Sequence, residues 1–257
     1  MVIGIVAGPD AGKTTMIATI YELLHRGRLD GYRFAGSETL RGYEERCHLA
    51  RIASNRETPD TPRTPRRAQL NFTHLRVATD AGIADLVFSD RSGEHFDTVL
   101  DYPTQIAEFA ELARADAILL LVELDRLAAT PHPCVSYLRR LVMAMSQCGL
   151  LEGKILRVVG TKADRLNSAA LIERTTAALM DLAGDLTRRA NCDVAIRPLV
   201  TASRRGPGNG GSGRGLKELL DDILAAEEPG SFRLSKIVPA QMTEMDALMV
   251  PYWDAQS

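Results

Sequence analysis

Short apolar runs rich in β-branched residues alternate along the chain with segments in which apolar residues recur at helical spacing. Strands are predicted at 2–7, 69–79, 83–89, 116–122, 154–159 and 194–200. The i, i+3, i+4, i+7 spacing of an amphipathic helix is clearest over 17–24 and 216–224. Further helices are expected at about 134–148 and 166–189.

This alternation predicts a doubly wound α/β fold, with a mostly parallel six-stranded sheet and helices on both faces. The tripeptide Asp80-Ala81-Gly82 separates two apolar runs and is typical of a hairpin turn. The strands on either side of it would then form the one antiparallel pair of the sheet.

Three segments fall outside the simple pattern. The first, 28–67, contains a possible helix at 38–54 and a proline- and threonine-rich stretch at 57–67. The second, 206–215, is rich in glycine and is expected to be a flexible loop. Periodicity also fades from about 229 onward. We therefore expect a domain over 1–228 with an insertion at about 28–67, followed by a C-terminal tail at 229–257.

Composition narrows the class of protein. The 257 residues are 45% hydrophobic, which is enough for the core of one α/β domain. A net charge of -2 gives no global reason to expect nucleic acid or an anionic membrane as partner. No apolar run reaches membrane length, and the four scattered cysteines are expected to be free thiols in a reducing, cytoplasmic setting. The histidines lack metal-ligand spacing.

The first predicted strand leads through a short loop straight into a helix. The loop and the start of the helix read Ala7-Gly8-Pro9-Asp10-Ala11-Gly12-Lys13-Thr14-Thr15. A phosphate-binding loop needs this order, because its amides and the helix N-terminus point at phosphate oxygens. Lys13 would neutralise the β- and γ-phosphates, and the Thr14 hydroxyl would ligate Mg²⁺. The alternative is a helix-capping turn with an exposed lysine.

A second polar segment, Asp90-Arg91-Ser92-Gly93, follows the apolar run 86–88. Asp90 would lie at the carboxyl end of a strand beside the phosphate loop, where its carboxylate can hold Mg²⁺ through water. Gly93 could bring its backbone N–H to the γ-phosphate. Taken alone, this tetrapeptide is also compatible with an ordinary turn.

Two further segments follow later strands and bear on the choice of base. Thr161-Lys162-Ala163-Asp164 follows the strand at 155–159. The Asp164 carboxylate can accept hydrogen bonds from guanine N1–H and the N2 amino group, a pair of donors that adenine lacks, while the Lys162 stem covers the base. Thr201-Ala202-Ser203 follows the last strand and places the Ala202 amide where it could donate to guanine O6.

These four segments, in this order and each at the end of a strand, resemble the G1, G3, G4 and G5 motifs of the Ras-like, translation-factor-related (TRAFAC) P-loop GTPases. The resemblance covers residues 1 to about 227. Three features are most similar to the bacterial double-GTPase families of predicted conflict and defence cassettes: the apolar entry to the phosphate loop, the D-x-S-G-E form of the third motif, and the long segment before the second predicted strand. The resemblance implies GTP or GDP, together with Mg²⁺, as ligands.

The resemblance also implies a switch threonine that ligates Mg²⁺ and lies shortly before the second predicted strand, 69–79. Thr64 is the best-placed candidate, with Thr61 and Thr58 behind it. Ras-like proteins have a water-orienting glutamine after the glycine of the third motif, where this chain has Glu94 followed by His95. The expected catalytic residues are then Lys13, Asp90, Gly93 and Glu94, with slow intrinsic hydrolysis.

The sequence therefore predicts a slow GTP-hydrolysing switch whose mobile segments contact a protein effector or partner subunit, with an antiviral or other defence role implied by the resemblance alone. An oligomer is compatible with the sequence. The rival is a nucleotide-bound scaffold subunit, which Glu94 favours, and a second rival, an ATPase, is disfavoured by Asp164. The arginines of 51–67 fit a solvated basic loop better than a catalytic arginine finger.

Overall fold

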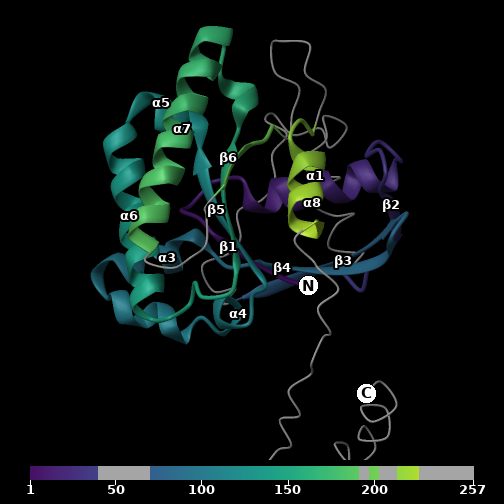
Figure 1. Ribbon diagram of the computed structural model, residues 1–257, viewed down its shortest axis with the longest axis horizontal. Coiled ribbons are helices and arrows are strands. Elements are labelled where there is room, and N and C mark those ends of the chain that lie inside the picture. Colours follow the sequence, from purple (N-terminus) through teal and green to yellow (C-terminus); the bar gives the residue numbers. More distant parts are fainter. Residues whose placement is uncertain (40–69, 191–196, 203–212, 226–257) are drawn as a thin grey trace, which may run out of the picture. The chain divides into compact units, whose positions relative to one another are not determined.

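The computed structural model describes residues 1–39, 70–190, 197–202 and 213–225 (Figure 1). Contacts group Met1–Leu224 into one compact unit. Several predictions concern residues outside the described ranges and stay predictions: the helix at 38–54 beyond residue 39, the switch threonines Thr64, Thr61 and Thr58, the arginines of 51–67, Ser203, and the tail at 229–257.

Within the described residues, the sheet has seven strands in the order β2-β3-β4-β1-β5-β6-β7. The strands are β1 Val2–Val6, β2 Arg33–Gly36, β3 Asn71–Thr79, β4 Gly82–Asp90, β5 Ala117–Glu123, β6 Ile155–Thr161 and β7 Arg197–Val200. The pairs β1–β4, β1–β5, β5–β6 and β6–β7 are parallel. The mostly parallel α/β fold class is confirmed, and all six predicted strands are present.

Two details of the strand prediction were wrong, and both concern β2. The expected hairpin is present, because β3 and β4 pair antiparallel from Thr79↔Gly82 to Asn71↔Asp90. β2 adds a seventh strand and a second antiparallel contact, with β3. It has only four residues, alternately exposed and half-buried, and its register shifts between Phe34 and Gly36. So short an edge strand leaves no apolar run in the sequence.

The helices follow the strands as expected for a doubly wound sheet. They are α1 Lys13–His25, α3 Gly93–Asp101, α4 Ala110–Ala113, α5 Leu124–Ala129, α6 Pro131–Gln147, α7 Ala169–Ala190 and α8 Leu216–Leu224, with 3₁₀ turns η2 Pro103–Glu108 and η3 Ala163–Arg165. The long helices match the prediction. The sequence did not predict α3, α4 or α5, which are too short to show a repeated helical period. No helix of the described ranges is long and apolar enough to cross a membrane.

Helices cover both faces of the sheet, as predicted, and β5 shows why. Its residues Ala117, Leu119 and Leu121 pack in one core with α1 and α8. Alternate residues Ile118, Leu120 and Val122 pack in the second core with α3, α6 and α7. Figure 1 shows α5, α6 and α7 together on one side and α1 with α8 on the other. A strand that is buried on both faces has no polar alternation, so β5 appears in the sequence as a continuous apolar run.

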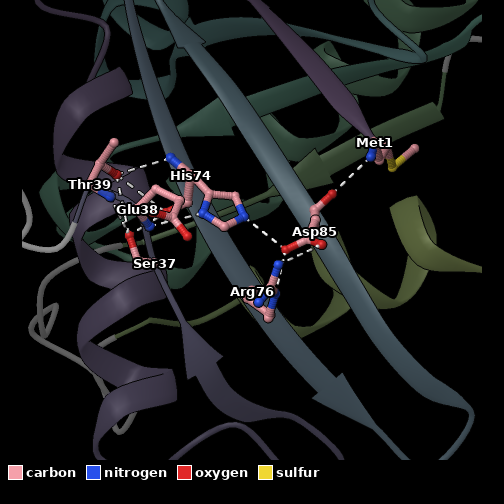
Figure 2. A network of polar contacts seen from close by, with 7 residues as sticks. All are labelled: Met1, Ser37, Glu38, Thr39, His74, Arg76 and Asp85. Carbon is pink, nitrogen blue, oxygen red and sulfur yellow. Dashed lines mark hydrogen bonds and ion pairs between the residues drawn. The ribbon is translucent and has the colours of Figure 1, made fainter. Parts of the chain in front are cut away.

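Polar contacts hold residues 37–39 against the outer part of the sheet (Figure 2). The backbone N–H of Glu38 donates to His74 Nδ1 at 3.0 Å, so this nitrogen must be an acceptor. His74 Nε2 therefore carries the proton and donates to Asp85 Oδ1 at 2.8 Å. Hydrogen bonds from Arg76 and then from His74 lower the pKa of the Asp85 carboxyl. This network fixes the path of the chain directly after β2.

Candidate functional site

The four polar motifs of the sequence meet at one edge of the sheet. They follow β1, β4, β6 and β7, and the pairing of these strands through β5 is parallel throughout. The carboxyl ends of parallel strands point the same way, so the loops that follow them lie side by side. β1 has β4 on one side and β5 on the other. The first motif therefore lies where the direction of winding reverses, which is where open α/β sheets bind ligands.

The loop after β1 has the backbone shape of a phosphate site. Asp10 and Gly12 are in the left-handed region, with φ of 60° and 85°, which turns the chain sharply into α1. Gly12 is the N-cap of α1 and has no side chain with which to cap the first amides. The first amide with an acceptor inside the helix is that of Met16, which donates to Gly12 O at 2.9 Å. The preceding amides suit an anionic ligand.

Lys13 lies at the start of α1 with only 7% of its surface exposed. Burial lowers the pKa of its ammonium group, and the carboxylates of Asp90, Asp10 and Asp97 act in the opposite direction. A buried ammonium group in the first turn of a helix is suited to meet an anion, which would offset the cost of keeping the charge buried. The alternative considered from the sequence, a helix-capping turn with an exposed lysine, does not hold, because the Lys13 side chain is buried.

Thr14 and Asp90 meet beside Lys13. The Thr14 hydroxyl donates to Asp90 Oδ2 at 3.0 Å, and Asp90 is fully buried at the end of β4. The preceding residue, Ser89, fixes β4 to β1, because Ser89 Oγ accepts from the Ile5 amide at 3.1 Å. A hydroxyl and a carboxylate are the hard oxygen ligands that Mg²⁺ takes in nucleotide sites. These two side chains therefore fit the ion.

Gly93 lies directly on the phosphate loop. A Cβ built on it would be 2.3 Å from Pro9 N, 2.4 Å from Gly8 C and 2.6 Å from Gly8 O. These are backbone atoms, which cannot move aside as the end of a flexible side chain can. α3 begins at Gly93, so the N-terminus of this helix and the phosphate loop are in contact. Only glycine permits this approach, and it brings the third motif beside the first.

We expect Gly93→Ala to weaken GTP binding by roughly tenfold or more, about 1.4 kcal/mol, because the methyl group must push the third motif off the phosphate loop. Isothermal titration with GTP and Mg²⁺ measures this loss. Gly184→Ala in α7 is the matched control, since its Cβ would meet only Arg188 Nη1, at an ordinary 3.7 Å. The control should keep GTP affinity and stability, and equal affinities for both variants would contradict the assigned contact.

Thr161 and Lys162 are both held in place by contacts with earlier parts of the chain. The Thr161 hydroxyl donates to Ala11 O at 2.8 Å, which ties the fourth motif to the phosphate loop. Lys162 has a left-handed φ of 58°, and its Nζ lies 2.5 Å from Glu123 Oε2. Glu123 ends β5 and is 8% exposed. Glu123 could not be singled out from the sequence, because its pairing with Lys162 joins the ends of two different strands.

Asp164 lies on η3 and is half-buried. The Ala163 amide donates to Thr201 O at 3.2 Å, so the fourth and fifth motifs are also in contact. The structure differs from the expected use of Ala202. Its amide donates to Arg214 O at 3.0 Å rather than remaining open for guanine O6.

The end of the predicted glycine-rich loop forms a defined turn. Gly213 N–H donates to Ala202 O at 3.0 Å, and Gly213 and Gly215 both have positive φ. A Cβ on Gly215 would lie 1.9 Å from Val200 O. In this described part, glycine therefore allows close packing against the end of β7, which composition alone could not distinguish from flexibility.

The family model named Double-GTPase 2 matches residues 1–224. This chain belongs to the Double-GTPase 2 family. A search of curated proteins returned no match. Among solved structures, this double-GTPase is similar to one described as the mammalian SRP receptor, with 14% identity over 86% of this chain and 98% of that chain and a TM-score of 0.45. It is also similar to the signal recognition particle receptor SRb-GTP/SRX complex from Chaetomium thermophilum, with 14% identity, 81% and 92% coverage and a TM-score of 0.46.

Family membership confirms the resemblance that the four motifs carried, and it implies guanine-nucleotide binding. This double-GTPase has Glu94 directly after Gly93, where Ras-like proteins have the water-orienting glutamine. Glu94 lies in the first turn of α3 and is half-buried. The neighbouring His95 has a buried Nδ1 with no hydrogen-bond partner among the described residues. An ionised Glu94 can only accept hydrogen bonds, whereas a neutral His95 ring has one donor and one acceptor nitrogen, on opposite sides of the imidazole.

A cavity of about 430 Å³ flanks the phosphate loop of the double-GTPase. Its lining includes Gly8 and Pro9 from the loop, Asp97 from α3, Glu123 from the end of β5 and Tyr137 from α6. Tyr137 reaches the loop itself, because its hydroxyl lies 3.6 Å from the position of a Cβ on Gly8. The loop is thus supported on the side of α6 as well as by α1.

Proposed function

We propose that this double-GTPase binds GTP with Mg²⁺ and hydrolyses it slowly, as a switch that controls contacts with a protein partner. One observation carries the proposal: the buried Lys13, the Thr14–Asp90 pair and Gly93 converge on a single loop. A group of this kind senses the γ-phosphate, since it combines a cation, magnesium ligands and the start of a separate helix. The family supports GTP as the nucleotide.

In this mechanism the protein works by positioning and by electrostatics. Lys13 and the amides before Met16 would neutralise the β- and γ-phosphate oxygens, and Thr14 and Asp90 would hold the metal. Mg²⁺, when bound, neutralises charge that develops on the phosphates. Water attack on the γ-phosphate would yield GDP and phosphate. Loss of the γ-phosphate would then release Gly93 and α3, which changes the surface offered to a partner.

The defence role rests on the resemblance to conflict and defence families alone, and the genes beside this one would test it. A nucleotide-bound scaffold subunit is the second candidate, and Glu94 favours it. Single-turnover hydrolysis of radiolabelled GTP with Mg²⁺ separates the two. The switch proposal expects GDP formation slower than about 10⁻³ s⁻¹. A protein that binds GTP but forms no GDP, with or without a candidate partner, is a scaffold.

We expect Glu94→Gln to raise the single-turnover rate of GTP hydrolysis by roughly tenfold, which corresponds to about 1.4 kcal/mol of transition-state stabilisation. An ionised glutamate only accepts hydrogen bonds and faces a negatively charged triphosphate, whereas glutamine can accept from the water and donate to a phosphate oxygen. Glu108→Gln on the exposed surface of η2 is the matched control and should leave the rate unchanged. A slower Glu94→Gln would make Glu94 a working catalytic residue.

A further inference from the structure

A buried ion pair follows immediately after Asp90, the proposed magnesium ligand. The Arg91 guanidinium donates through Nε to Glu111 Oε1 at 2.5 Å and through Nη2 to Glu111 Oε2 at 2.9 Å. The two side chains are 13% and 1% exposed. Both oxygens of the carboxylate are engaged, so the pair is bidentate and its geometry is fixed in a plane. Arg91 and Glu111 were not singled out from the sequence.

Aromatic residues enclose the pair and connect it to α3. The Arg91 Cζ atom lies 4.0 Å from the centroid of the Phe109 ring. Phe109 in turn meets Phe96 edge to face, with centroids 5.5 Å apart. Phe96 is fully buried and lies on α3, three residues after Gly93. The chain is therefore anchored to one cluster both before and after the glycine that lies on the phosphate loop.

Stability alone does not account for a charged pair at this place. Moving two charges out of water is unfavourable, and a buried ion pair is often no more stabilising than apolar residues of similar volume. What the bidentate arrangement does supply is orientation, because a planar guanidinium against a planar carboxylate permits few geometries. The segment that it orients carries Asp90 on one side and Gly93 on the other.

We propose that Glu111 is a positioning residue for the third motif. Through Arg91 it fixes the direction of the Asp90–Gly93 segment, so that Asp90 meets Thr14 at 3.0 Å and Gly93 stays against Gly8 and Pro9. Glu111 touches neither nucleotide nor metal in this account. The predicted change in the magnesium dependence of GTP binding rests on the proposed function. The predicted change in the hydrogen exchange of the Asp90–Gly93 segment rests on the structure alone.

Glu111→Gln in the full chain tests the proposal by two measurements. The ratio of the GTP dissociation constant in EDTA to that in Mg²⁺ should fall by roughly tenfold, because Asp90 no longer holds its place. Hydrogen exchange of the ligand-free protein should speed up at residues 90–96, while β6 keeps its protection. Arg91→Lys keeps the charge but not the planar fork, so it should reproduce both changes. Arg91→Lys therefore also tests the proposal if Glu111→Gln fails to fold.

The matched control is another buried ion pair on the opposite face of the sheet. Arg157 of β6 pairs with Asp222 of α8, and the side chains are 7% and 18% exposed. Asp222→Asn should lower the melting temperature and leave both the magnesium ratio and the exchange of 90–96 unchanged. If Glu111→Gln behaves in the same way, the pair is only structural and the proposal is overturned. If the parent shows no magnesium dependence, the proposed function fails, and hydrogen exchange still decides the role of Glu111.

Discussion

Lys13→Ala is expected to abolish tight GTP binding and to leave the fold intact. The ammonium group is buried with a lowered pKa, so the ligand-free fold gains little from its charge. The phosphates of a bound nucleotide would add favourable charge interactions that the ligand-free protein lacks, so we expect the charge to contribute mainly in the complex. The melting temperature without nucleotide should therefore stay the same or rise.

The measurement is thermal unfolding with and without GTP and Mg²⁺. At a GTP concentration about 100 times the dissociation constant, the parent should gain roughly 2.7 kcal/mol of stability, and Lys13→Ala should gain none. Lys217→Ala on α8 is the control, because this lysine pairs with Asp221 at the surface and should not affect the nucleotide shift. Full stabilisation of Lys13→Ala by GTP would overturn the assignment of the phosphate loop.

The placement of the motifs could be predicted because it depends on local pattern. A polar residue that ends an apolar run marks the end of a strand, and this rule located Asp90 at the end of β4 and Thr161 at the end of β6. Parallel topology then brings such residues to the same edge of the sheet. That geometry places the third motif beside the first, whereas the contact of Gly93 with the backbone of Gly8 and Pro9 was not predicted from the sequence.

Contacts between residues far apart in the sequence could not be predicted in the same way. Glu111 and Glu123 look like ordinary acidic residues, yet each is buried and paired with a cation that belongs to a motif, Arg91 or Lys162. Periodicity and spacing in the sequence do not identify such partners, because they come together only when separate strands and helices pack. The Ala202 amide shows the same limit, because its acceptor is the carbonyl oxygen of Arg214, in the glycine-rich segment 206–215, which has no periodic pattern.

We expect the choice of guanine over other bases to depend on Asp164. This carboxylate lies on η3, in a loop that is fixed by the Thr161 bond to Ala11 O and by the Ala163 bond to Thr201 O. The loop is thus positioned relative to the phosphate loop before any base arrives. ATP should not compete with GTP, because adenine has no pair of donors for a carboxylate.

Asp164→Asn is expected to weaken GTP binding by roughly 100-fold and to permit binding of xanthosine triphosphate. Hydrogen bonds to a charged group contribute about 1.5 kcal/mol or more each, so losing two of them amounts to about 3 kcal/mol. The asparagine amide can instead donate to the xanthine oxygen that replaces the guanine amino group. Isothermal titration with both nucleotides measures the exchange of specificity, and Asp181→Asn on the exposed side of α7 is the matched control. Unchanged GTP affinity in Asp164→Asn would show that another group reads the base.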